Sequence, residues 1–150
     1  MSVPTSLPAF RALSPATIEG LQRINEGVKQ SGIDAALIEL VKLRVSQING
    51  CAFCLSVHLK EAERLEIDSR RLHLLAAWRE ANLYSERERA ALAWAEALTR
   101  VAVAGLPESL VEQMREHFTE TELAQLTAAV VAINGFNRIA LAYRFPVGAP

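Results

Sequence analysis

The sequence predicts an all-α protein, a compact bundle of about six to seven helices. Apolar residues recur at helical spacing along almost the whole chain, and no stretch alternates β-branched and polar residues between turn signals as a strand would. Helix-capping residues also divide the chain into segments of helical length. With 150 residues, of which 51% are hydrophobic, the chain can bury a sizeable core, so we expect a single domain spanning residues 1–150.

The first two predicted helices have clear signals at both ends. Ser14 can cap a helix with Pro15 at its first position, and this helix runs to Ser31. Asp34 can cap a second helix. That helix ends at Asn49-Gly50, because glycine readily takes the left-handed conformation that closes a helix.

A third predicted helix begins at the cysteine pair. Its apolar residues continue the helical period as far as Leu65, which puts Cys51 and Cys54 in its first turn. Asp68 can cap a fourth helical segment, which we expect to end near Asn82.

Two capping boxes, residues 85–88 and 119–122, open the fifth and the last predicted helices. A turn at residues 105–107, with its proline at the first helical position, precedes a short sixth helix. The last helix is apolar on most sides, which suggests burial inside the bundle or in a subunit interface. Gly135 should weaken this helix by ~1 kcal/mol, and Asn134 and Asn137 are expected to satisfy buried polar partners.

Charge and hydropathy argue against two classes of partner. The 16 Lys and Arg and 17 Asp and Glu are interspersed and leave a net charge of -1, so we expect no nucleic-acid partner. The longest apolar stretch, Leu126 to Ile133, is too short to span a bilayer, so we expect no membrane partner. The first residues, MSVPTSLPAF, have neither the basic nor the apolar region of a signal peptide, so we expect a cytoplasmic protein.

The two cysteines are too few for the disulfide framework of a small secreted domain, and a close pair in a reducing compartment indicates a reactive or metal-binding site. On a helix with 100° per residue, Cys51, Cys54 and His58 share one face. Residues three apart in a helix have Cα atoms roughly 5 to 6 Å apart, which a disulfide accepts. A reversible bond between the two sulfur atoms is therefore permitted.

The same three residues have the chemistry of a thiol redox centre. A thiol in the first turn of a helix is stabilised as a thiolate by the unpaired N–H groups and the helix dipole, and His58 can take the proton. Such a site can attack a peroxide oxygen, form a sulfenic acid and release water as the disulfide closes. The chain has no nicotinamide or flavin fingerprint, so we expect no bound cofactor and an external dithiol or protein reductant.

Together with Glu39, these residues match a known motif. The chain resembles the alkylhydroperoxidase D-like proteins of the carboxymuconolactone decarboxylase superfamily, whose core motif is a glutamate followed twelve residues later by Cys-x-x-Cys-x-x-x-His. Glu39, Cys51, Cys54 and His58 stand at that spacing. The stretches INGCAFCLSVHLKEA, LAAWREANLYSERERAALAWAEALT and AAVVAINGFNRIALAYRF also look like family members. The resemblance covers about residues 15–146, which we take as the core of the domain.

The resemblance implies an antioxidant thiol peroxidase that reduces hydroperoxides. It implies that Cys54 attacks the peroxide and that Cys51 is its resolving partner, with Glu39 and His58 as the proton relay. The best-known family member has an additional histidine immediately before the second cysteine, where this chain has Phe53, so the full relay is not carried over. Family members assemble as trimers or hexamers, so we expect a homo-oligomer, which would account for the apolar last helix.

Other interpretations of the same residues stay open. Glu39, Cys51, Cys54 and His58 could supply four metal ligands, although the second Cys or His pair of a structural zinc site is missing. The protein could also be a non-catalytic redox sensor or interaction protein. A carboxymuconolactone decarboxylase-like enzyme is the weaker analogy, because that branch does not need the cysteine pair. Attachment of c-type haem is excluded, because Leu55 follows the second cysteine.

Overall fold

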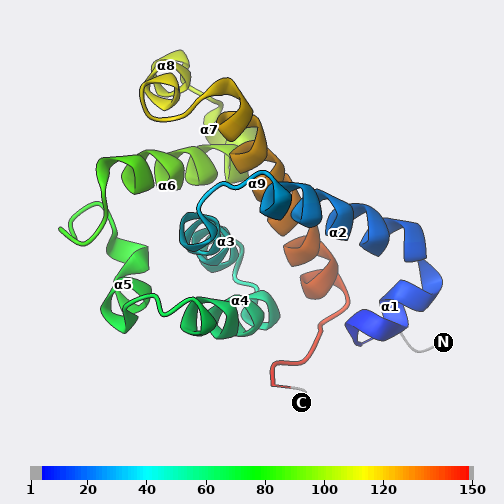
Figure 1. Cartoon of the computed structure of the whole chain (residues 1–150). Coiled ribbons are helices and arrows are strands. Elements are labelled where there is room, and N and C mark those ends of the chain that lie inside the picture. The colour runs from blue at the N-terminus through cyan, green and yellow to red at the C-terminus, as the bar shows by residue number, and fades with distance from the viewer. Residues whose placement is uncertain (1–4, 149–150) are drawn as a thin grey trace.

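The computed structural model describes residues 5–148, and within this range it contains nine α-helices, one short 3-10 helix and no strand (Figure 1). The prediction of an all-α bundle is confirmed. The elements in chain order are α1 (Leu7–Leu13), α2 (Pro15–Gln30), α3 (Ala35–Asn49), α4 (Ala52–Arg64), α5 (Ser69–His73), η1 (Leu75–Ala77), α6 (Glu86–Thr99), α7 (Val101–Ala104), α8 (Glu108–His117) and α9 (Glu120–Ala142).

Helix α3 lies at the centre of the bundle, and α4, α6 and α9 pack around it (Figure 1). Helix α2 packs along α9 on the side away from α6. Nine of the fifteen residues of α3 are buried, including the polar side chains of Glu39, Lys42 and Ser46. A buried polar group is costly unless it has a partner, so these three residues indicate a candidate functional region of α3.

The capping signals place most helix ends correctly. The side chain of Asp34 accepts a hydrogen bond from the N–H of Ala36, and Ser85 and Thr119 each form a complete capping box. Helix α1 was not predicted from the sequence, although Ser6 caps it and Pro8 lies in its first turn.

The predicted fourth helix is wrong beyond its first turn. After α5 the chain forms the short 3-10 helix η1 and then turns, instead of one helix reaching Asn82. The guanidinium of Arg89, on α6, donates to the backbone carbonyls of Trp78, Arg79 and Ala81. These carbonyls are satisfied by a distant side chain, so the segment does not need helical hydrogen bonds.

Helix α9 continues through Asn134-Gly135 without a break. A Cβ atom at Gly135 would lie 3.0 Å from Cδ2 of Leu21, so glycine allows α2 and α9 to approach closely. Half of the apolar residues of α9 are buried, and Ala128, Phe136 and Ile139 are partly buried against the same core, so packing on α2, α3 and α6 accounts for much of its apolar sequence. Val131 and Leu141 are its exposed large apolar side chains.

Candidate active site

The chain turns from α3 to α4 within two residues. Gly50 caps α3 with a φ of 70°, in the left-handed region. Cys51 is the N-cap of α4 and has an extended backbone, so the prediction that both cysteines lie in the first helical turn is correct for Cys54 and wrong for Cys51. The N–H of Cys51 donates to the carbonyl of Ser46 at 3.0 Å, which fixes the start of α4 against the end of α3.

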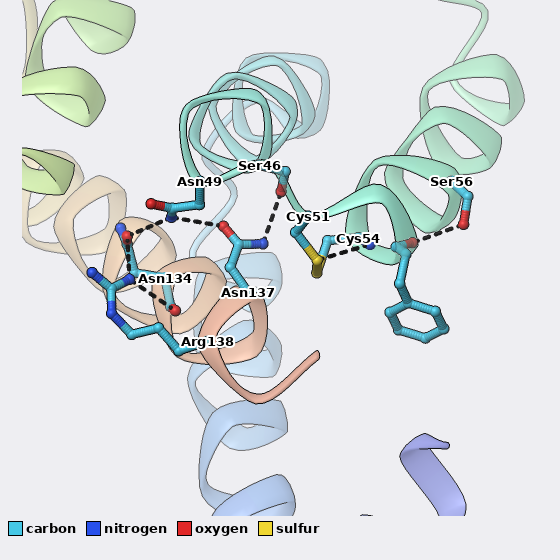
Figure 2. Close-up of a disulfide and its surroundings, with 9 residues drawn as sticks. Ser46, Asn49, Cys51, Cys54, Ser56, Asn134, Asn137 and Arg138 are labelled. Atoms are coloured by element: carbon cyan, nitrogen blue, oxygen red, sulfur yellow. Dashed lines mark hydrogen bonds between the residues drawn. A yellow bond between two sulfur atoms is a disulfide. The ribbon is translucent and has the colours of Figure 1, made fainter. Parts of the chain in front are cut away.

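Cys51 and Cys54 form a disulfide, with Cα atoms 5.3 Å apart (Figure 2). This separation confirms that the spacing permits a bond between them. The sulfur of Cys51 also accepts a hydrogen bond of 3.2 Å from the N–H of Cys54, in the place of an N-cap oxygen. Both cysteines are buried, with 1% and 3% of their surface exposed.

Glu39 and His58 form a hydrogen-bonded pair across α3 and α4. The Nδ1 atom of His58 lies 2.8 Å from Oε2 of Glu39, although the two residues are 19 positions apart. His58 follows Cys54 by one turn of α4, and residues four apart in a helix are neighbours on one face. An imidazole held in this way has one nitrogen fixed by a carboxylate, which leaves the other free for proton transfer.

Lys42 also belongs to the site, although it was not predicted from the sequence. Its Nζ lies 3.8 Å from Oε1 of Glu39, and only 11% of its side chain is exposed. Burial lowers the pKa of Lys42, while the charges of Glu39 and Glu61 raise it. The available signal was a lysine three residues after Glu39 in a helix that is otherwise largely apolar.

A second polar network joins α3 to α9 behind the disulfide (Figure 2). The side-chain amide of Asn137 donates to Oγ of Ser46 at 3.0 Å, and Asn49 donates to the amide oxygens of both Asn134 and Asn137. The prediction that Asn134 and Asn137 satisfy buried polar partners is confirmed. Because Ser46 also accepts from the N–H of Cys51, this network anchors the cysteine turn to the last helix.

Phe53 occupies the position before the second cysteine. Its ring packs edge to face against Phe145, with ring centroids 5.3 Å apart. This side of the site is therefore apolar and is partly covered by the segment that follows α9.

The described residues, 5–148, contain neither a metal-binding cluster nor a membrane-spanning helix. No group of three or more His, Cys, Asp or Glu side chains in this range could hold a metal ion. Within the same range, no helix is both long enough and apolar enough to cross a membrane.

Comparison with known proteins identifies the family. The sequence pattern of the carboxymuconolactone decarboxylase family matches residues 15–97, more than half of the chain. The chain belongs to this family. It is also 34% identical to the uncharacterized protein YdfG of Bacillus subtilis over 134 residues, which are 89% of this chain and 91% of YdfG.

Solved structures identify the AhpD-like branch of the superfamily. The chain matches ATU0492 from Agrobacterium tumefaciens, a protein of unknown function named as a candidate antioxidant defence protein AhpD. The TM-score is 0.88 and the identity 37%, over 94% of this chain and 97% of the other. The debrominase Bmp8 has the same fold at 20% identity, with a TM-score of 0.82 over 94% of this chain and 76% of Bmp8. The chain is thus an AhpD-like member of the superfamily.

Proposed function

We propose that this protein is a thiol-dependent peroxidase that reduces hydroperoxides through a reversible disulfide between Cys51 and Cys54. The observation that carries the proposal is the bonded cysteine pair at the start of α4, with the Glu39–His58 pair one helical turn further on. The family membership and the structural likeness to an AhpD-type protein support the same chemistry.

In the proposed cycle, the Cys54 thiolate attacks the outer oxygen of the hydroperoxide after His58 has taken the thiol proton. The O–O bond breaks, the leaving alkoxide receives a proton through His58, and Cys54 becomes a sulfenic acid. The Cys51 thiol then attacks the Cys54 sulfur, and the sulfenic oxygen leaves as water. An external dithiol reduces the disulfide and is itself oxidised, so one hydroperoxide consumes one dithiol.

The roles of the two cysteines follow from their positions. Cys54 is the third residue of α4, where the N–H groups and the helix dipole favour a thiolate, and it is on the His58 face. Cys51 lies outside the helix on a tight turn and is within bonding distance of Cys54. Glu39 holds the imidazole through Nδ1 and fixes its orientation.

Free-thiol titration tests the cycle. Reduced wild type should lose two thiols after one equivalent of cumene hydroperoxide. Cys51→Ser should lose one thiol and form a sulfenic acid that dimedone traps, because the resolving thiol is absent. Cys54→Ser should keep its remaining thiol, and full hydroperoxide turnover by this variant would refute the proposal.

We also propose a homo-oligomer, a trimer or a hexamer, located in the cytoplasm. Exposed Val131 and Leu141 on α9 are candidates for the contact between subunits. Sedimentation velocity of the wild type gives the subunit count, and a monomer at micromolar concentration would contradict the proposal.

A further inference from the structure

A cavity of about 530 Å³ lies beside the Glu39–His58 pair, between α2, α3 and α4. Glu39 and His58 form part of its wall, but neither cysteine does. Its volume is that of an ordinary small-molecule pocket. The disulfide chemistry described above does not require a cavity of this size.

Most of the cavity wall is apolar. Val28 and Ile38 are buried beneath it, and Ile33, Val57 and Leu65 complete it. Val57 is 44% exposed, so apolar surface of this wall faces solvent. A wall of this composition favours the hydrocarbon part of a ligand, because binding removes apolar surface from water.

Two polar side chains in the same wall, Lys42 and Asn25, have hydrogen-bonding groups that no described residue uses. Lys42 is almost completely buried, and its only polar contact within residues 5–148 is the one to Glu39 at 3.8 Å, longer than a hydrogen bond. The Oδ1 atom of Asn25 is buried and has no hydrogen-bond partner among the described residues. A buried amide oxygen without a hydrogen bond is costly, and the Lys42 ammonium, which makes no hydrogen bond within this range, has donors available for a ligand at the same wall.

The charges around the cavity favour an anion. The wall has three acidic side chains: Glu39 is held by His58, Glu61 is paired with Arg64 at 2.5 Å, and Glu26 is exposed to solvent. Lys42 is the one buried cation of this wall, because Lys29, Lys60 and Arg64 are exposed and water screens their charges. A cation with unused donors, in apolar surroundings, matches a carboxylate at the end of a hydrocarbon chain.

We propose that this cavity binds a carboxylate with an apolar tail, of the type of a medium-chain fatty acid. The carboxylate accepts hydrogen bonds from the Lys42 ammonium and, after the side-chain amide rotates, from the NH₂ group of Asn25. The tail lies along the apolar wall. The bound ligand then lies next to His58.

Calorimetric titration of the full-length, oxidised protein with dodecanoate, below the concentration at which it forms micelles, tests the proposal. We expect one dodecanoate per chain and weaker binding of dodecanol, which has the tail but no charge. Lys42→Met should weaken dodecanoate binding about tenfold or more, because a charge-assisted hydrogen bond is lost, and should leave dodecanol binding unchanged. Asn25→Ala should weaken dodecanoate binding by a smaller factor.

Lys60→Gln is the matched control, because it removes a positive charge from the rim of the same cavity, and it should change the affinity less than twofold. Circular dichroism checks that each variant is folded. The proposal is overturned if wild type does not bind dodecanoate, if Lys42→Met binds it as tightly as wild type, or if Lys60→Gln has the same effect. It is also overturned if the protein is a homo-oligomer that Val57→Glu dissociates and the partner subunit is found to cover the cavity. Because these are binding measurements, they stand or fall independently of peroxidase turnover.

Discussion

Glu39 and Glu96 are two buried glutamates on neighbouring helices, α3 and α6, and their surroundings are very different. Glu96 is 4% exposed and receives hydrogen bonds from Arg44, Trp78 and Arg79, at 2.8, 2.9 and 2.5 Å. Glu39 is 7% exposed, and its one hydrogen-bond partner among the described residues is His58. The carboxylate of Glu96 is surrounded by hydrogen-bond donors, whereas the carboxylate of Glu39 faces the imidazole of His58.

The difference suggests two different uses of a buried carboxylate. Burial raises the pKa of Glu96, but the hydrogen bonds from Trp78, Arg79 and Arg44 outweigh it and lower the pKa below its ordinary value. Glu96 therefore stays ionised and joins α3 and α6 to the irregular segment around Trp78. Glu39 has spare acceptor capacity and an imidazole as its hydrogen-bond partner, which suits proton transfer more than it suits stability.

Replacing Glu39 should have the largest effect on activity. Glu39→Gln keeps the shape of the side chain and removes the charge that holds the imidazole, so we expect kcat/KM for an organic hydroperoxide to fall about 100-fold or more. Steady-state turnover with an excess of dithiol measures this. Glu61→Gln, in the wall of the same cavity, is the control and should stay within twofold of wild type. An unchanged rate in Glu39→Gln would remove this residue from the proposed relay.

Replacing Glu96 should instead affect stability. Glu96→Gln leaves the largely buried guanidinium of Arg44 without its counter-charge, so we expect a loss of about 3 kcal/mol in the free energy of unfolding. For a chain of this length, that corresponds to a fall of about 6–12 °C in the melting temperature. Urea denaturation measures the free energy, and turnover per folded molecule should not change. Equal losses of stability in Glu39→Gln and Glu96→Gln would contradict the contrast between the two glutamates.

The pH dependence of stability should separate the two sites further. A carboxyl group whose pKa is lower in the folded chain stabilises the protein above its unfolded pKa, whose ordinary value is 4.5, and this contribution is lost as the pH falls through the folded pKa. We therefore expect wild type to lose stability in acid more steeply than Glu96→Gln. Glu61 and Glu122 also have lowered pKa values, but they titrate in both proteins, so the difference isolates Glu96. Parallel curves of urea midpoint against pH below about 5 would show that Glu96 is not the linked group.

The sequence predicts local features of the molecule better than long-range ones. The starts of α3, α6 and α9 follow from capping residues, which act within three positions of the backbone groups that they bind. The break after α5 depends on Arg89, which reaches back to carbonyls eight to eleven residues earlier, and no local pattern encodes such contacts.

For the candidate site, too, local features could be predicted from the sequence and long-range contacts could not. Cys51 and Cys54 are close in sequence, so their bond could be predicted from spacing alone, whereas the approach of His58 to Glu39 came only from the resemblance to a family. The partner of Lys42 is Glu39, one turn away on the same helix, whereas the partners of Glu96 lie on α3 and in the turn after η1. A charged residue within an apolar stretch was the available signal in both cases, and it indicates burial without indicating the partner.

Replacing Arg79 should have the smallest effect. It tests whether the stability that Glu96 provides depends on the number of its hydrogen-bond donors or on the burial of those donors. Its hydrogen bond to Glu96 is short, but 59% of its side chain is exposed, compared with 13% for Arg44. Exposed ion pairs contribute little, since water solvates the charges once the pair is broken. We expect Arg79→Ala to cost about 1 kcal/mol or less, part of it from the lost stacking on Trp78. Urea denaturation should show a much larger cost for Arg44→Ala. Equal costs would mean that each donor matters regardless of exposure, and burial would then no longer explain why Glu96 holds the fold together.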